Sequence, residues 1–191
     1  QELKDIQGIF VTHEHLDHIK GVGILSRRYD IPVYATEGTW RGMEDGLGNI
    51  VEKNKKIIEI GASVEVGTIQ LDAYPVLHDA LEPCGFTITD GKKKISIATD
   101  LGYVTEEVID ALQGSDFVVL ESNYDDELLR YSGYPYALKS RLRSNQGHLS
   151  NEDAGKLSVF LVQSGITRIA LAHLSKENNH PMLAQQVISE M

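Results

Sequence analysis

The sequence predicts an α/β fold with layered sheets. Strand-like and helix-like segments alternate near both ends of the chain, and strand-like segments dominate its middle. The 191 residues give room for one substantial core, so we expect a single domain over residues 1–191. No apolar run approaches the ~20 residues of a spanning helix, so we expect no membrane partner.

Short runs of apolar and β-branched residues predict the strands of the first half. In order, these strands cover residues 8–12, 31–35, 63–66, 68–76, 85–89 and 94–99. Asp90-Gly91 is typical of the turn between the last two. A helix is expected to begin near Gly21, and Thr36 is expected to cap a short helix containing Trp40.

Helices and strands alternate again in the second half. Thr105 and Ser150, each followed by acidic residues, are typical of helix N-termini, and the second helix should run to about residue 164. The remaining expected elements are strands over 116–121 and 168–172, a helix over 125–131, a loop over 133–136 and a last helix after His180-Pro181 that the chain end cuts off. We expect His180 to precede that helix rather than to bind a metal ion.

Cysteine content and net charge limit the classes of protein. Cys84 is the one cysteine, so neither an internal disulfide nor a thiolate-rich zinc site can form, and a reducing, cytoplasmic compartment fits best. We expect Cys84 to be a buried structural thiol. The net charge of -10 argues against broad nonspecific attraction to nucleic acid. Bound metal ions and a local basic strip can still serve a nuclease.

The strongest functional signal is the segment His13-Glu14-His15-Leu16-Asp17-His18. Residues two apart on an extended strand point the same way, so His13 and His15 can grip one metal ion. Asp17 and His18, just past the strand end, can face a second ion. Imidazole and carboxylate ligands without thiolate suit zinc, manganese or iron and are typical of catalytic sites.

Three further donors each follow a strand-like run: His78, Asp100 and His173. Ligands from distant parts of a sequence meet where strand ends share one edge of a sheet. We therefore expect these three side chains to complete a centre of two divalent ions.

In this order, and with Thr12–Gly21 as signature, the motifs resemble those of the metallo-β-lactamase superfamily. The resemblance implies a four-layer αβ/βα sandwich, which has strands before its first histidine motif and more chain after its last helix. We expect both to be missing from this chain, which starts at Gln1. The ligands that the resemblance implies are His13, His15 and His78 for one ion, Asp17, His18 and His173 for the other, and Asp100 bridging both.

Two features favour phosphodiester substrates. Gly147–Gly155 resembles the His-Ser/Thr helix start of the superfamily's tRNase Z-like phosphodiesterases, which implies that His148 assists the leaving oxygen. The basic strip before it offers Arg141, Arg143 and Asn145 as weaker candidates for phosphate contacts. The nucleophile would be a hydroxide bridging the two ions, and Asp17 would also orient it.

Four segments, residues 121–125, 133–135, 147–151 and 173–179, resemble the bacterial YycJ/WalJ group of the superfamily. This resemblance implies a cytoplasmic, metal-dependent 5′ to 3′ exonuclease acting on DNA. One alternative is a dinuclear hydrolase of a small molecule, such as a cyclic phosphodiester, lactone or thioester. Another is a non-catalytic, metal-stabilised regulatory module.

Four tyrosines near the basic strip allow two interpretations: Tyr124, Tyr131, Tyr134 and Tyr136. Exposed tyrosines can stack on nucleic-acid bases. More often such residues pack a loop against its domain, and we expect packing here.

Overall fold

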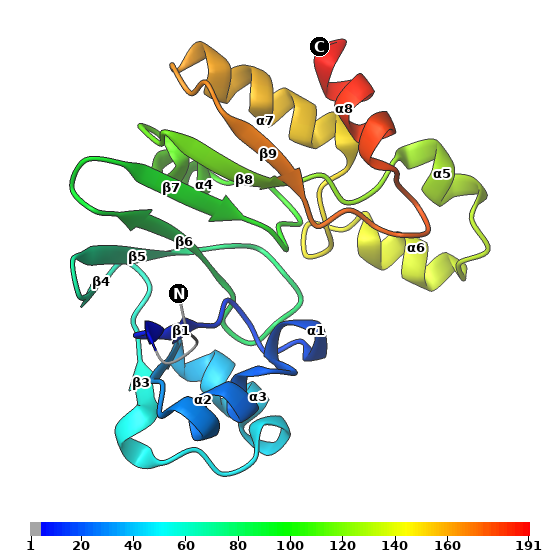
Figure 1. Ribbon diagram of the computed structural model, residues 1–191. Helices are drawn as coiled ribbons and strands as arrows, with labels where there is room; N and C mark the ends of the chain where they lie inside the picture. The colour runs from blue at the N-terminus through cyan, green and yellow to red at the C-terminus, as the bar shows by residue number, and fades with distance from the viewer. Residues whose placement is uncertain (1–4) are drawn as a thin grey trace. The chain divides into compact units, whose positions relative to one another are not determined.

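The computed structural model describes residues 5–191, which divide into two compact units (Figure 1). The first unit comprises the described residues up to Pro75 together with residues 80–86, and the second comprises 76–79 and 87–191. Strands and helices alternate along the chain as the sequence predicts. In the described part of the chain, no helix is long and apolar enough to cross a membrane.

A parallel sheet of three short strands forms the centre of the first unit. Strands β1 (Ile9–Phe10), β2 (Val33–Ala35) and β3 (Lys55–Ile57) lie side by side in this order. The other elements of this unit are helices α1 (Leu16–Ile19), α2 (Val22–Tyr29) and α3 (Glu37–Leu47), the 3-10 turn η2 (Glu52–Asn54) and the antiparallel pair β4 (Ser63–Val66) and β5 (Ile69–Pro75). Val33 and Met43 are fully buried between sheet and helices.

Two sequence signals in the first unit have the predicted effect. The Thr36 hydroxyl accepts a hydrogen bond from the Thr39 N–H, so Thr36 caps α3. Cys84 is buried, as expected, at the start of β6 (Cys84–Thr89), a strand that begins in the first unit and ends in the second.

The second unit is built on a parallel sheet in the order β7 (Lys94–Ala98), β8 (Phe117–Glu121) and β9 (Ile169–Ala172). Its helices are α4 (Glu106–Leu112), α5 (Asp126–Tyr131), α6 (Tyr136–Leu142), α7 (Asn151–Gln163) and α8 (Pro181–Ser189). Ala98 lies beside Leu120 and Glu121 beside Ala172 in the sheet register. The carboxyl ends of the three strands therefore share one edge, where the residues that follow them gather.

Three sequence predictions need correction. The strand expected over residues 8–12 is confined to Ile9–Phe10. The first part of the basic strip, including Arg141, lies in α6, a helix that the sequence analysis did not assign, whereas Arg143 is its C-cap and Asn145 lies beyond it. The last helix is not cut off, because α8 ends at Ser189 within the chain.

Candidate metal centre

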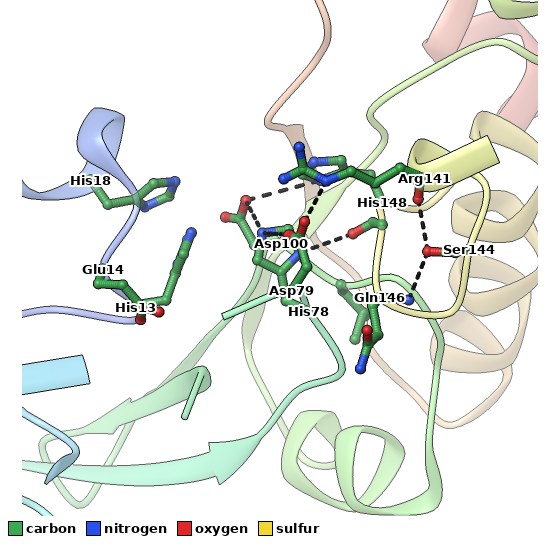
Figure 2. Close-up of polar contacts among 12 residues, drawn as sticks. His13, Glu14, His18, His78, Asp79, Asp100, Arg141, Ser144, Gln146 and His148 are labelled. Atoms are coloured by element: carbon green, nitrogen blue, oxygen red, sulfur yellow. Dashed lines mark hydrogen bonds and ion pairs between the residues drawn. The ribbon is translucent and has the colours of Figure 1, made fainter. Parts of the chain in front are cut away.

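The histidine motif of the first unit brings its donors together over a very short stretch of chain. The ring centroid of His13, which is fully buried, lies 4.5 Å from that of His15 and 4.1 Å from that of His18. The Oδ2 atom of Asp17 lies 3.7 Å from Nε2 of His18. Figure 2 labels His13 and His18 of this set.

The backbone that places these donors differs from the predicted strand. His15 is extended, with φ -62° and ψ 144°, and acts as the N-cap of α1, so Asp17 and His18 lie on that helix. Glu14 anchors the segment, because its Oε1 accepts the N–H of Leu81 at 2.8 Å. Residues 11–15, which lie outside any strand, and the single helical turn α1 therefore carry the donors that we expected on and just past one strand.

In the second unit, Asp100 lies close to His78, as Figure 2 shows, and also close to His173. Its Oδ1 is 3.7 Å from Nε2 of His78 and 3.5 Å from Nε2 of His173. These separations are too long for hydrogen bonds but close to the ~3.3 Å between two ligands of one tetrahedral ion with bonds of about 2.0–2.1 Å. The side chains therefore suit an arrangement in which one carboxylate shares an ion with each histidine.

Glu121, at the end of β8, is a buried carboxylate that holds two histidines in place. Its Oε1 accepts Nδ1–H of His148 at 2.9 Å and of His173 at 2.6 Å. Its Oε2 accepts the backbone N–H groups of Leu101 and Leu149 at 2.9 and 3.2 Å. Burial alone would raise the pKa of Glu121, but the hydrogen bonds from both histidines outweigh burial and lower that pKa to about 2.

An ionised Glu121 can only accept hydrogen bonds, so it assigns the Nδ1 proton to both histidines and directs each Nε2 away from itself. Nδ1 of His78 is likewise anchored, at 3.0 Å from the Gly147 carbonyl. Burial lowers the pKa of His78, which favours the neutral imidazole that a metal ion needs. Metal-binding histidines are usually oriented by such hydrogen bonds, so these side chains fit the implied ions.

The backbone at two of these donors is strained. Asp100 and His173 have φ values of 56° and 55°, in the left-handed region that side chains rarely adopt. Each such residue costs on the order of 1–2 kcal/mol, and strain of this kind clusters at functional sites. Both donors stand just beyond their strands β7 and β9, where the chain must turn.

Close main-chain contact brings the segments of Asp100 and His148 together. A Cβ atom at Gly102 would collide with the carbonyl of Asn145, and one at Gly147 would collide with the carbonyl of Leu142. Glycine at both positions therefore allows an approach that no other residue permits.

Comparison with known proteins identifies the family. A family model described as the beta-lactamase superfamily domain matches residues 1–173. The chain belongs to this superfamily. Exodeoxyribonuclease YycJ of Bacillus anthracis is 41% identical over 99% of the chain and 72% of its own length. Exodeoxyribonuclease WalJ of Streptococcus pneumoniae is 38% identical over 97% of the chain and 70% of its own length.

The solved structure of the metallo-β-lactamase fold protein YhfI from Bacillus subtilis matches with a TM-score of 0.74 at 17% identity. The match covers 98% of this chain and 72% of that one. It shows the fold alone, which is the metallo-β-lactamase fold predicted from the sequence. The chain is shorter than these relatives, and its His/Asp/Glu donors are those of a metallohydrolase of the superfamily.

The other predicted site residues of this superfamily member lie in the second unit. The ring centroid of His148 is 5.0 Å from that of His78 and 5.3 Å from that of His173. The guanidinium of Arg141 contacts the carboxylate of Asp79, as Figure 2 shows. Arg143 donates to the Asp126 carboxylate at 3.1 Å, and Asn145 is exposed. His180 caps α8 as expected, accepting the N–H of Met182.

Sequence reasoning missed Glu121 as a site residue. The only signal was a carboxylate directly after the apolar run 117–120, at the end of a strand predicted to be buried. A charged residue in such a place needs partners, because an unpaired buried carboxylate is strongly destabilising. Its partners, His148 and His173, are 27 and 52 residues away in sequence.

Proposed function

We propose that this protein is a metal-dependent nuclease that hydrolyses DNA phosphodiesters from the 5′ end. The observation that carries the proposal is the placement of His148. This histidine is held by Glu121 beside the ligand candidates His78 and His173, although the implied ligand set does not need it. A thioester hydrolase does not need a further acid there, because a thiolate leaves without a proton, whereas the departing oxygen of a phosphodiester gains from one. Two relatives named as exodeoxyribonucleases support the same reaction.

The proposed cofactors are two divalent ions, zinc, manganese or iron. When bound, they would activate a water molecule and neutralise charge on the phosphoryl oxygens. Their ligands would be His13, His15, Asp17, His18, His78, Asp100 and His173, all within a single domain over residues 1–191. With a single, buried cysteine, the protein suits the cytoplasm.

Three side chains of the protein would have the remaining roles in the reaction. Asp17 would orient the attacking water. His148, whose Nδ1–H is fixed on the ionised Glu121, would carry a second proton on Nε2 and give it to the leaving oxygen. Glu121 would stabilise the resulting charge on the imidazole and keep the ring in position.

The test compares wild type with Asp17→Ala and His148→Ala on duplex DNA labelled at either end, with manganese or zinc. We expect immediate release of the 5′-terminal mononucleotide by the wild type and none by Asp17→Ala. His148→Ala should bind as much metal as the wild type, by elemental analysis, while turnover falls about 10²–10⁴-fold.

Three outcomes would contradict parts of this proposal. An unchanged rate in His148→Ala would remove that residue from the reaction. Earlier loss of the 3′ label would reverse the polarity. If DNA remained intact although two ions were bound, RNA or a small phosphodiester would become the substrate to test.

A further inference from the structure

The charge balance of the chain reverses between the last part of α5 and the start of α7, although α5 itself begins with Asp126 and Glu127. From Leu128 to Asn151 the sequence contains four Lys or Arg residues and no Asp or Glu, in a chain whose net charge is -10. A strongly acidic protein that acts on a polyanion needs such a local positive region, because phosphates are attracted by nearby cations rather than by the global sum.

The partners of these cations differ. Arg143 is shared with Asp126, and Nζ of Lys139 donates to the carbonyls of Arg130 and Ser132 at 2.7 and 2.8 Å, which closes the loop between the helices. Arg130 makes no ion pair with any residue that the structure describes. Its guanidinium lies 5.6 Å from the ring centroid of Tyr131. Arg130 therefore offers an uncompensated charge beside an aromatic ring.

The tyrosines of this region are unusually exposed. The predicted packing is correct for Tyr124, which is buried, but wrong for Tyr131 and Tyr136, which are 77% and 85% exposed. Exposed aromatic rings among cations are the combination that binds single-stranded nucleic acid, because each ring can stack on an unpaired base.

A pocket of about 660 Å³ opens between the same helices, whose arrangement Figure 1 shows. It is lined by Arg130, Tyr134, Tyr136, Lys139, Ser140 and Arg143. Its size lies in the ~300–1,000 Å³ range of small-ligand sites, which a nucleotide unit can occupy.

The pocket is linked to the metal centre through His148. The turn from Arg143 to Gly147 joins α6 to this histidine, and the His148 N–H donates to the Leu142 carbonyl in the last turn of α6 at 3.0 Å. A DNA strand bound to α5 and α6 would therefore lie close to His148, the proposed general acid, which follows α6 after a short turn.

We propose that the basic-aromatic surface, defined as Arg130, Tyr131, Tyr134, Tyr136, Lys139 and Arg143, binds single-stranded DNA next to the metal centre. Tyr131 and Tyr136 stack on bases, while Arg130 and Arg143 contact phosphates. The choice of a single strand follows from stacking, since bases in a duplex already stack on one another. This assignment rests on the proposed nuclease function and adds the form of DNA that is held during the reaction.

The main experiment measures binding of a labelled oligothymidylate of ~16 nucleotides, a length that spans such surfaces, in the presence of a chelator so that nothing is cleaved. For the double variant Tyr131→Ala/Tyr136→Ala we expect Kd to rise at least about tenfold, since stacking contributes about 5- to 150-fold per base. Tyr131→Phe/Tyr136→Phe keeps the rings and should bind like the wild type. Tyr103→Ala, at a tyrosine 53% exposed outside this surface, is the matched control and should change Kd less than twofold.

A second measurement tests the charge. Arg130→Gln should reduce the slope of log affinity against log salt by about 0.7, the value for one phosphate contact on a single strand. Lys92→Gln, at an exposed lysine outside the surface, should leave the slope unchanged. An equal slope in wild type and Arg130→Gln would remove Arg130 from the site.

The proposal for this surface and the proposal for the reaction fail differently. With metal present, kcat/KM for single-stranded DNA relative to that for a small chromogenic diester should fall about tenfold in the double alanine variant. Two results would contradict the proposed surface but not the nuclease. The protein could cut DNA with an affinity that the alanine substitutions leave unchanged, or it could bind duplex DNA as tightly as single-stranded DNA. If binding of single-stranded DNA depended on the two tyrosines but no DNA were cut, the proposed nuclease function would be contradicted and the proposed surface would not.

Discussion

The two units supply metal-ligand candidates in opposite ways. The first unit takes four donors from six consecutive residues, and His15 among them has ordinary extended backbone. The second unit gathers donors up to about a hundred residues apart, and two of them, Asp100 and His173, have left-handed backbone. A compact motif needs only a short segment between β1 and α1 and the one helical turn that follows it. An assembled set also needs a sheet edge, strained turns and the buried Glu121 to hold its imidazoles.

The largest effect is expected for Asp100, the donor that lies close to both His78 and His173 in the second unit. Asp100→Asn keeps the shape of the side chain and tolerates the left-handed backbone but loses the charge that two ions would share. Metal content should fall and turnover should drop about a thousandfold, since a catalytic ion is worth several kcal/mol. Asp30→Asn is the control, because Asp30 also has positive φ, 54°, but lies outside the motifs. Equal metal content in both variants would contradict the bridging role.

The second-largest effect is expected for Glu121, the buried carboxylate that orients the histidines of the second unit. In Glu121→Gln one acceptor oxygen becomes an NH2 donor, so the side chain can no longer accept from both histidines and from both backbone N–H groups. The negative charge that holds the two Nδ1–H groups is lost as well, and the histidines lose their fixed orientation. We expect metal affinity or turnover to fall about 10- to 100-fold, as for other residues that orient ligands. Titration of the metal-free protein with zinc measures this, with Glu106→Gln, at an exposed residue of α4, as the control. Unaltered affinity and turnover would show that the ligands hold their positions without Glu121.

Backbone strain should distinguish the donors of the two units by a smaller difference, measured in the free energy of unfolding. His173→Gly should be more stable than His173→Ala by about 1–2 kcal/mol, because glycine adopts φ 55° without strain. At His15, whose φ is -62°, glycine relieves no strain. Its entropy cost and its preference over alanine at an N-cap oppose each other, so these two variants should differ by less than about 1 kcal/mol. Urea unfolding of the four metal-free variants measures both differences. An equal advantage of glycine at both positions would mean that strain does not distinguish the two sets of donors.

The smallest effect is expected for the buried thiol of Cys84 in the first unit and concerns how stability depends on pH. Burial raises the pKa of Cys84 from about 9 to about 12, whereas the buried Glu121 has its pKa lowered by two histidines. The folded state thus favours the neutral thiol, and this contribution to stability is complete below pH 9 and is lost as the pH rises toward 12. Alkylation followed by mass spectrometry should find Cys84 unreactive at pH 8 until the chain is unfolded. Rapid labelling of the native protein would place the thiol at the surface.

The sequence predicted most elements because their signals are local. Thr36, Thr105 and Ser150 each cap the helix that follows, and the histidine motif is contained in six residues. The role of Glu121 could not be predicted, since its partners are brought near only by the sheet. Helix α6 was missed because the Gly133-Tyr134-Pro135 turn signal ends directly before its first residue, Tyr136. The exposure of Tyr131 and Tyr136 also depends on tertiary packing, which residue type alone does not report.

The facing glycines at positions 102 and 147 limit how this protein can change over generations. Neither carries a metal-ligand atom. A methyl group on Gly102 would nevertheless push the segment of Asp100 away from the turn before His148, and one on Gly147 would push that turn away from the end of α6. We expect harmful natural variants at these two positions that leave every ligand intact. A relative with a side chain at either position would need a different main-chain path there, however complete its histidine motifs.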